Sequence, residues 1–419
     1  MMKRRKKGGA FVFTELVDHI TDISVFTESL RDWISNLSIN SIIILVMMIF
    51  MVVGAVDRVR GNKLGYGAEF EQGFQAMGPL ALAMAGVVAA APVLSILLKP
   101  IIVPLYGLLG ADASIFATTL LGSDMGGYPL AMELAENETI GNFSGLILGS
   151  MMGATVVFTI PVALTLIRRE DRAVLGAGIL TGLITIPLGC IAGGLVMNLT
   201  GYTLSLVEIA RNLIPVILFA LLIIIGLWFK PEGMIWGFNR FGKGVTILIT
   251  IFTAIAVFEY QTGIMFPLMD VMVKPDLNQN IPLETGLLVC GQIATVLIGA
   301  FPMVKWFTKT FSGPLARISA RVGVNKTACT GLIASLANNI AMFTLLETMN
   351  QKGKLMNIAF AVSGAFVFGD HLGFAAGVNK TMIFPMIVGK LIAGITALVL
   401  ANYLSPILLQ KVEQVNKKG

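Results

Sequence analysis

Three short polar clusters interrupt long apolar stretches of this sequence, and they are its first candidates for chemistry. One is Ser123-Asp124-Met125-Gly126-Gly127, which Tyr128 and Pro129 follow. Its carboxylate can attract a cation, while the glycines and the proline would break a helix and release backbone groups. Backbone groups released inside a membrane must line a polar cavity or be buried in protein. This cluster therefore predicts a binding site at a break in a helix.

The other two clusters lie in the second half of the chain. Asn338 and Asn339 place two amides inside an apolar stretch, and Asp370 and His371 place an acid beside one of the 2 histidines. A charge at the centre of a membrane costs about 2.5 to 3.5 kcal/mol on insertion scales and marks a functional site. An aliphatic amine, with a pKa near that of lysine at about 10, would arrive as a cation and need an anionic or amide-rich pocket. We therefore predict that the substrate binds to Ser123, Asp124, Met125, Gly126, Gly127, Asn338, Asn339, Asp370 and His371.

Each candidate also has a purely structural interpretation. Asp370 could form a buried ion pair with Lys390, and Asp124 could cap the N-terminus of a half-helix. The two asparagines could bond across helices. His371 could be held neutral by a hydrogen bond rather than sense protons, and Glu71 could lie at an interface edge rather than act in gating.

The composition excludes an ordinary soluble protein. Of the 419 residues, 56% are hydrophobic and 13% charged, and the mean hydropathy is +0.83. The net charge of +6 arises from Lys and Arg clusters beside apolar windows, so it indicates membrane orientation and not nucleic-acid binding. Cys190, Cys290 and Cys329 show no paired spacing, and no metal-ligand, cofactor or catalytic pattern is present. We therefore expect no disulfide, metal, cofactor or enzymatic activity, and membrane lipid as the surroundings.

The apolar windows predict an all-α polytopic integral membrane protein, with about ten or eleven transmembrane helices and breaks near the midplane. The predicted windows are Ile42–Val56, Gln72–Leu98, Ser114–Leu134, Phe143–Ile167, Ala173–Met197, Asn212–Phe229, Gly244–Phe258, Thr285–Val304, Thr327–Leu346, Leu355–Val378 and Met382–Leu404. Charge placement puts Glu136 outside and Arg168 and Arg172 inside. Eleven full crossings would put Lys411 outside, against the same rule, unless one segment is re-entrant. The side of the C-terminus therefore stays open.

Two halves of the chain align at an offset of about 213 residues, as Gly110 with Gly323 and Ser150 with Ser363 illustrate. This predicts an internal duplication, parallel or inverted, with the substrate held where the halves meet. The predicted parts are a basic extension over 1–40, a first repeat with a linking helix over 41–235, a second repeat over 236–410 and a polar tail over 411–419. Within the extension, the apolar spacing from Glu15 to Leu37 predicts either an amphipathic helix on the inner membrane surface or a mobile tail.

Long strings of this sequence also resemble the ethanolamine utilisation transporter family EutH over nearly all of 42–404. They include Gln75-Ala76-Met77-Gly78, Asp124-Met125-Gly126-Gly127, Leu148-Gly149-Ser150-Met151-Met152-Gly153, Leu336-Ala337-Asn338-Asn339-Ile340 and Gly369-Asp370-His371-Leu372-Gly373-Phe374. The basic extension of about forty residues departs from the family pattern, which leaves regulation or membrane targeting open.

The resemblance implies import of ethanolamine through a bacterial cytoplasmic (inner) membrane. The helix breaks at matched positions of the two halves predict alternating access around a midplane site, and an inside-negative potential would draw in a cation without a co-transported ion. A carrier or a gated channel for another small cationic amine is the alternative. Coupling to protons or sodium, assembly into a homo-oligomer and selectivity among small amines stay open.

Overall fold

The computed structural model describes residues 22–276 and 279–418 and divides into two units, 1–45 and 46–419. In the first unit, helix α2 (Ser24–Ser35) has no buried residue, and α3 (Ile39–Val59) begins after it and continues into the second unit. Part of the stretch predicted as helical is present as α2, while residues 15–21 lie outside the described residues. The basic cluster at 3–7 lies outside the described residues.

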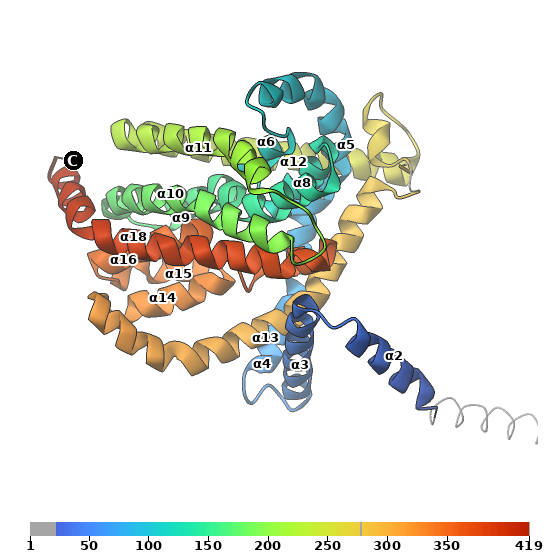
Figure 1. Cartoon of the computed structure of the whole chain (residues 1–419), viewed down its shortest axis with the longest axis horizontal. Coiled ribbons are helices and arrows are strands. Elements are labelled where there is room, and N and C mark those ends of the chain that lie inside the picture. Colours follow the sequence, from blue (N-terminus) through green and yellow to red (C-terminus); the bar gives the residue numbers. More distant parts are fainter. Residues whose placement is uncertain (1–21, 277–278, 419) are drawn as a thin grey trace, which may run out of the picture. The chain divides into compact units, whose positions relative to one another are not determined.

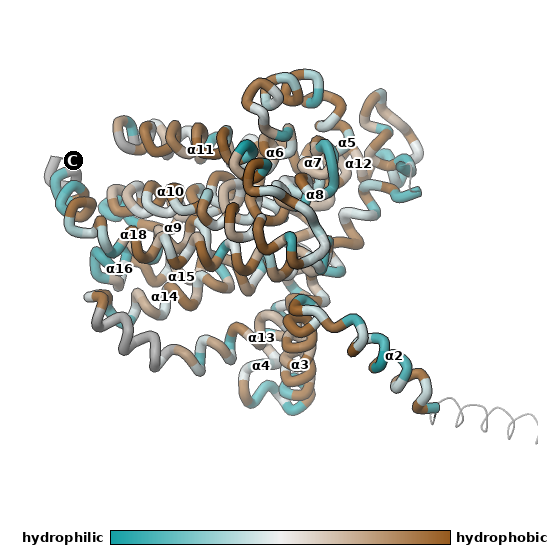
Figure 2. Tube along the Cα trace, in the orientation of Figure 1, coloured by the Kyte–Doolittle hydropathy of each residue, from teal (hydrophilic) through white to brown (hydrophobic). Residues whose placement is uncertain are grey.

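The described part of the chain is helical and contains no strand, which confirms the predicted all-α polytopic class. Eight helical runs within it are long and apolar enough to cross a membrane. They are Ile39–Val59, Tyr66–Leu108, Glu138–Leu166, Arg169–Met197, Leu206–Leu227, Trp236–Thr262, Pro282–Phe311 and Lys380–Gln414. Figure 2 shows apolar residues along most of these helices. The three remaining predicted windows are each broken into two short helices.

The first broken window forms a hairpin, here called the first hairpin, over residues 114–134. It contains α6 (Ser114–Leu120), a tip with a 3-10 turn at Ser123–Met125, and α7 (Gly127–Leu134). Both ends of the hairpin meet at Asp112, whose Oδ2 accepts a hydrogen bond from the Glu136 amide at 2.9 Å. The hairpin therefore enters and leaves at the same end of the molecule.

The second broken window forms the second hairpin, over residues 326–345. Helix α14 (Lys326–Ala337) and helix α15 (Asn339–Leu345) meet at a tip around Asn338. The Asn325 side chain donates to Thr348 O at 2.8 Å, and the Asn350 side chain donates to Gly323 O at 2.9 Å. This hairpin is also closed at its base by side-chain amides, so it too returns to the end from which it starts.

The two hairpins start from opposite ends of the surrounding helices. The run from Glu138 to Leu166 leaves the base of the first hairpin. It comprises α8 (Glu138–Asn142), the π-helical segments η2 (Phe143–Gly153) and η3 (Thr155–Thr159), and α9 (Ile160–Leu166). It ends beside Arg168, which pairs with Glu347 at the base of the second hairpin. The two hairpin tips therefore point toward each other.

The third broken window contains α16 (Gln351–Ser363) and α17 (Asp370–Val378), with a non-helical stretch over 364–369. This stretch pairs with the tip of the second hairpin, because the Phe366 and Phe368 amides donate to Ser335 O and Leu336 O, each at 2.9 Å. Gly369 is required there, since an added Cβ would lie 2.1 Å from Ala337 O.

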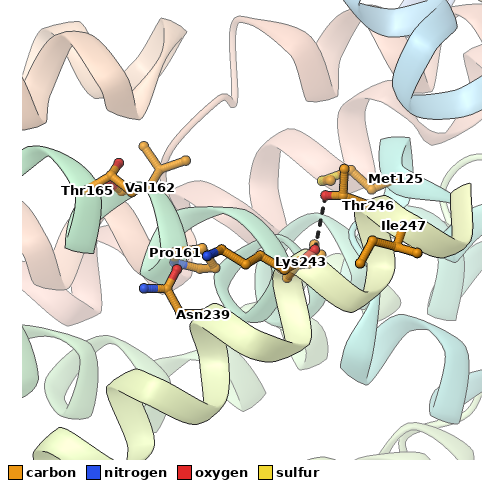
Figure 3. A pocket seen from close by; sticks show the side chains of 10 residues that line it. Met125, Pro161, Val162, Thr165, Asn239, Lys243, Thr246 and Ile247 are labelled. Carbon is orange, nitrogen blue, oxygen red and sulfur yellow. Dashed lines mark hydrogen bonds between the residues drawn. The ribbon is translucent and has the colours of Figure 1, made fainter. Parts of the chain in front are cut away.

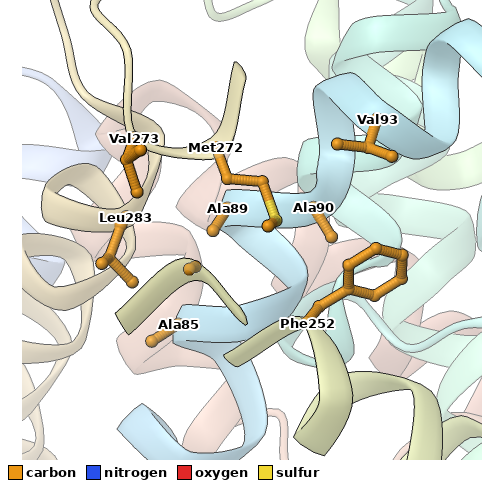
Figure 4. Close-up of a cluster of buried hydrophobic side chains, with 9 residues drawn as sticks. Ala85, Ala89, Ala90, Val93, Phe252, Met272, Val273 and Leu283 are labelled. Carbon is orange, nitrogen blue, oxygen red and sulfur yellow. The ribbon is translucent and has the colours of Figure 1, made fainter. Parts of the chain in front are cut away.

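Long helices hold these breaks in place. Helix α10 (Arg172–Met197) packs against α16 and against α18 (Ile383–Lys418), as Figure 1 shows. On another side, α5 (Met77–Leu108) packs against α12 (Pro231–Thr262) and α13 (Pro282–Val322). A buried cluster including Ala89, Phe252, Met272 and Leu283 fills this contact (Figure 4). Small residues such as Ala89 let the helix backbones approach closely.

Candidate functional site

Two of the predicted clusters come together at the tip of the first hairpin. Asp124 Oδ1 lies 3.8 Å from Nε2 of His371, which is the second residue of α17. Asp370 directly precedes His371 in the chain, so both carboxylates lie near this imidazole. Both aspartates are half-buried, whereas His371 is 3% exposed and its Nδ1 has no hydrogen-bond partner among the described residues. Within the described residues, no hydrogen bond at Nδ1 holds this imidazole neutral.

Lys390, from α18, supplies the positive charge of this cluster. It is 1% exposed and its ammonium donates a hydrogen bond to Ser150 O on η2. Gly149, the neighbour of Ser150, packs against Ser123 beside Asp124. The described residues contain no ion pair between Lys390 and Asp370. The structural interpretation of Asp370 as the partner of Lys390 is thus wrong in this structure.

The charges of this cluster leave room for one more cation. If both carboxylates are ionised and His371 is neutral, Asp124 and Asp370 carry two negative charges against the one positive charge of a protonated Lys390. Buried charges need partners, because an isolated charge in a medium of low dielectric is strongly disfavoured. A small ammonium ion would neutralise the remaining negative charge. It could reach the two carboxylates because both are partly exposed to solvent.

The two asparagines have different surroundings. The Asn338 side chain caps α15 by accepting from the Ile340 amide at 2.7 Å. Asn339 is fully buried and donates to Thr159 Oγ1 at 3.0 Å and to Ala361 O at 3.2 Å, so it bonds across helices as its structural interpretation predicted. Asn338 follows Ala337, whose carbonyl lies against Gly369. Asp370 is the residue after Gly369.

The remaining predicted residues shape the tip of the first hairpin. Ser123 donates to Gly145 O at 2.6 Å and fixes the tip against η2. Gly126 has φ +89°, which favours glycine, and an added Cβ there would lie 1.7 Å from Val87 Cγ1. An added Cβ on Gly127 would lie 2.5 Å from Leu121 O. Asp124 caps no half-helix, since α7 begins after Gly126 without a side-chain cap.

Two clefts approach the tips. Met125 lines one of about 450 Å³ together with Pro161, Lys243 and Thr246 (Figure 3). Asn338 lines another of about 540 Å³ together with Gln72, Glu69 and Lys305, where Glu69 pairs with Lys305 at 3.0 Å. The first cleft therefore reaches Met125, the neighbour of Asp124. The second reaches Ala337 and Asn338, and Ala337 lies against Gly369, the residue before Asp370.

Thr159 and Ser363 were not predicted from the sequence, although both lie buried beside the breaks. Threonine and serine are common in membrane helices, so their types alone give no signal. The one signal in the sequence is the alignment of Ser363 with Ser150, and Thr159 has none.

Comparison with known proteins agrees with the long strings noted in the sequence. The profile of the family described as "Ethanolamine utilisation protein, EutH" matches residues 39–404. A probable ethanolamine permease EutH of Listeria monocytogenes is 51% identical over 375 residues, covering 90% of this chain and 96% of that protein. One of the same name from Salmonella typhimurium is 46% identical over 395 residues, covering 88% and 96%. No solved structure shows a significant match. This chain belongs to the EutH family of ethanolamine utilisation proteins.

Proposed function

We propose that this chain is a carrier, not an enzyme, that imports protonated ethanolamine across the bacterial cytoplasmic membrane. The names of its relatives, probable ethanolamine permeases, support the substrate class. The observation that carries the proposal is the approach of Asp124 to the break that carries Asp370 and His371, in a region where Lys390 is buried against Ser150. Two opposite charges 4 Å apart attract by about 4 kcal/mol at an effective dielectric constant of 20, enough to hold an ammonium that has lost part of its hydration.

In this proposal, Asp124 and Asp370 bind the ammonium group and the Asn338 amide bonds the hydroxyl group. Asn338 keeps hydrogen-bonding capacity. Its Oδ1 caps α15, while its Nδ2 donates to no group in the described part of the chain. Asn339 supports the tip from behind through Thr159 and Ala361. Ser123, Gly126 and Gly127 shape the turn that presents Asp124.

Inverted repeats are the proposed framework for alternating access. At the offset of 213 residues, α6 and α7 correspond to α14 and α15, and the run 138–166 corresponds to 351–379. The hairpins starting from opposite ends support inversion, and transporters with inverted repeats hold substrate where the halves meet. With two re-entrant hairpins, α18 would end on the side of Arg168. The positive-inside rule supports this arrangement, because the lysine-rich C-terminus would then lie inside.

Counterflow in proteoliposomes tests carrier against channel. Vesicles loaded with unlabelled ethanolamine should accumulate labelled ethanolamine transiently, because a carrier exchanges one substrate molecule for another. Equal competition by choline and ethanolamine would contradict the assigned substrate, and saturation without counterflow would contradict a carrier.

A further inference from the structure

A second set of buried polar groups lies behind the tip of the second hairpin and is separate from the carboxylates. It consists of Thr155 and Thr159 on η3, Asn339 on α15, and the last turn of α16 at Ala361, Val362 and Ser363. The four side chains are at most 2% exposed. None of these residues carries a charge, and the described residues contain no His, Cys, Asp or Glu group suited to a metal.

Two polar atoms in this set have no hydrogen-bond partner among the described residues, namely Asn339 Oδ1 and Ser363 Oγ. The orientation of the Asn339 amide is fixed, because its nitrogen donates to the Ala361 carbonyl, which could not accept a bond from an oxygen. Leaving a buried acceptor unpaired costs about 1 to 3 kcal/mol. Asn339 bonds Ala361 O, two residues before Ser363, so both unpaired atoms belong to segments that are in contact, and a ligand that binds them would remove this cost.

The other oxygens of the set keep unused lone pairs. Thr155 Oγ1 donates to Val362 O at 2.6 Å, and Asn339 Nδ2 donates to Thr159 Oγ1 at 3.0 Å. A carbonyl or hydroxyl oxygen has two lone pairs, so Val362 O and Thr159 Oγ1 can each contact a further group. The helix α16 ends at Ser363, and the negative end of its dipole adds to a preference for a cation.

The first half of the chain shows a cation at the corresponding place. Ser150 aligns with Ser363 at the offset of 213 residues, and Ser150 O accepts a hydrogen bond from the buried ammonium of Lys390. The residue that aligns with Lys390 is Ala177, on α10, which packs against α16. An alanine cannot supply the corresponding charge to Ser363, so a cation there would have to come from solution.

We propose that the oxygens of Thr155, Thr159, Asn339, Val362 and Ser363 bind a Na⁺ ion whose entry is coupled to substrate import. A neutral oxygen set suits a monovalent ion, because Ca²⁺ and Mg²⁺ sites in proteins use carboxylates. Unwound carbonyls and the C-terminal ends of half-helices are where transporters hold coupling cations. The coupling rests on the proposed import of ethanolamine, whereas binding of Na⁺ does not.

Thermal unfolding of the purified full chain in detergent tests the binding. Matched NaCl, KCl and choline chloride solutions of equal ionic strength are compared, with and without ethanolamine. We expect NaCl alone to raise the melting temperature by at least about 2 °C, as a ligand that binds only the folded state does. Ser363→Ala removes an unpaired hydroxyl, so it should fold as well as the wild type in KCl and lose the increment in NaCl.

Ser150→Ala is the matched control, since Ser150 is equally buried but its hydroxyl already bonds Ile147 O at 2.9 Å. It should keep the Na⁺ increment. Equal melting temperatures in the three salts, or an increment that survives Ser363→Ala, would overturn the site. Stabilisation by ethanolamine but not by Na⁺, lost in Ser363→Ala, would assign these oxygens to the substrate and overturn the proposal.

Uptake of labelled ethanolamine into proteoliposomes tests the coupling. An inward Na⁺ gradient should stimulate uptake over an equal K⁺ gradient, and Ser363→Ala should reduce that ratio to about 1. Equal uptake under both gradients would overturn the coupling while leaving ethanolamine import intact. No uptake in any salt would instead contradict the proposed function, and the melting experiment would still decide the Na⁺ site.

Discussion

Asp124 Oδ1 lies 3.8 Å from His371 Nε2, although the two residues come from different halves of the chain. The tip of the first hairpin carries Asp124, and the break between α16 and α17 presents Asp370 and His371. Neither half contains the site alone. Motion of one half relative to the other would therefore change the site itself, which is what alternating access requires.

Asp124→Asn and Asp370→Asn should each reduce ethanolamine uptake by about 10- to 100-fold. A hydrogen bond to a charged group contributes roughly 1.5 to 3 kcal/mol, and about 1.4 kcal/mol corresponds to a factor of ten. The control is Asp270→Asn, in the loop before α13, where the Lys274 hydrogen bond lowers the pKa of Asp270. Initial uptake rates, normalised to protein in the membrane, give the comparison. Wild-type rates in both site variants would refute the role of these carboxylates.

Lys390 and Asp124 should be energetically coupled. The change in unfolding free energy of the double variant Asp124→Asn/Lys390→Met should differ from the sum of the two single changes by at least about 0.5 kcal/mol. The effects of substitutions within one charge network are not additive. Chemical unfolding of the purified chain completes the cycle. The changes in unfolding free energy caused by Asp270→Asn and Lys390→Met should add. Additive changes for Asp124→Asn and Lys390→Met would show that Lys390 does not belong to the site.

The ion pair between Asp171 and Lys354 should contribute more to stability than the pair at the hairpin base. Its atoms lie 2.6 Å apart, with side-chain exposures of 3% and 8%. Asp171→Asn leaves a buried ammonium without its partner and should cost about 3 to 5 kcal/mol. Glu347→Gln, in the exposed pair with Arg168, should cost at most about 1 kcal/mol. Similar losses in the two variants would show that burial does not set the difference.

Gly369→Ala should disrupt the contact between the second hairpin and the break after α16. The added Cβ would lie 2.1 Å from a backbone oxygen, Ala337 O, which cannot move aside as a side chain can. Gly176→Ala, on α10 where an added Cβ meets nothing within 4 Å, should be neutral or stabilise by roughly 0.5 to 1 kcal/mol. Melting temperature and uptake are measured together. A Gly369→Ala variant with wild-type values in both would mean that the two segments are not in contact.

The hairpin bases should be labelled from opposite sides of the membrane. Glu136→Cys and Gln351→Cys place exposed thiols at the first and second base, whereas Cys190, Cys290 and Cys329 are buried. An impermeant maleimide should react with Glu136→Cys only in right-side-out vesicles and with Gln351→Cys only in inverted ones. Reaction of both from the same side would contradict the inverted arrangement.

The apolar windows predicted the helical class because a membrane span needs a long uncharged stretch, and glycine, proline and asparagine placed the breaks. Re-entry could not be read from hydropathy, because the hairpin over 114–134 is as long and apolar as a crossing. It depends on side-chain bonds such as that from the Glu136 amide to Asp112. Likewise, Asp124 and Asp370 could be identified because carboxylates are rare in apolar stretches. Serine is common there, so Ser363 becomes a candidate only once the structure shows that its hydroxyl is buried without a partner among the described residues.

The most direct test of the central claim is uptake of labelled ethanolamine by proteoliposomes containing this protein alone, with equal Na⁺ on both sides. A potential of 100 mV, inside negative, is worth about 2.3 kcal/mol per charge, or roughly fifty-fold accumulation of a monovalent cation. We predict saturable accumulation that follows the imposed potential and is lost in Asp124→Asn. Uptake of ethanolamine that is indifferent to the potential, or that survives in Asp124→Asn, would contradict import of the ammonium form at this site.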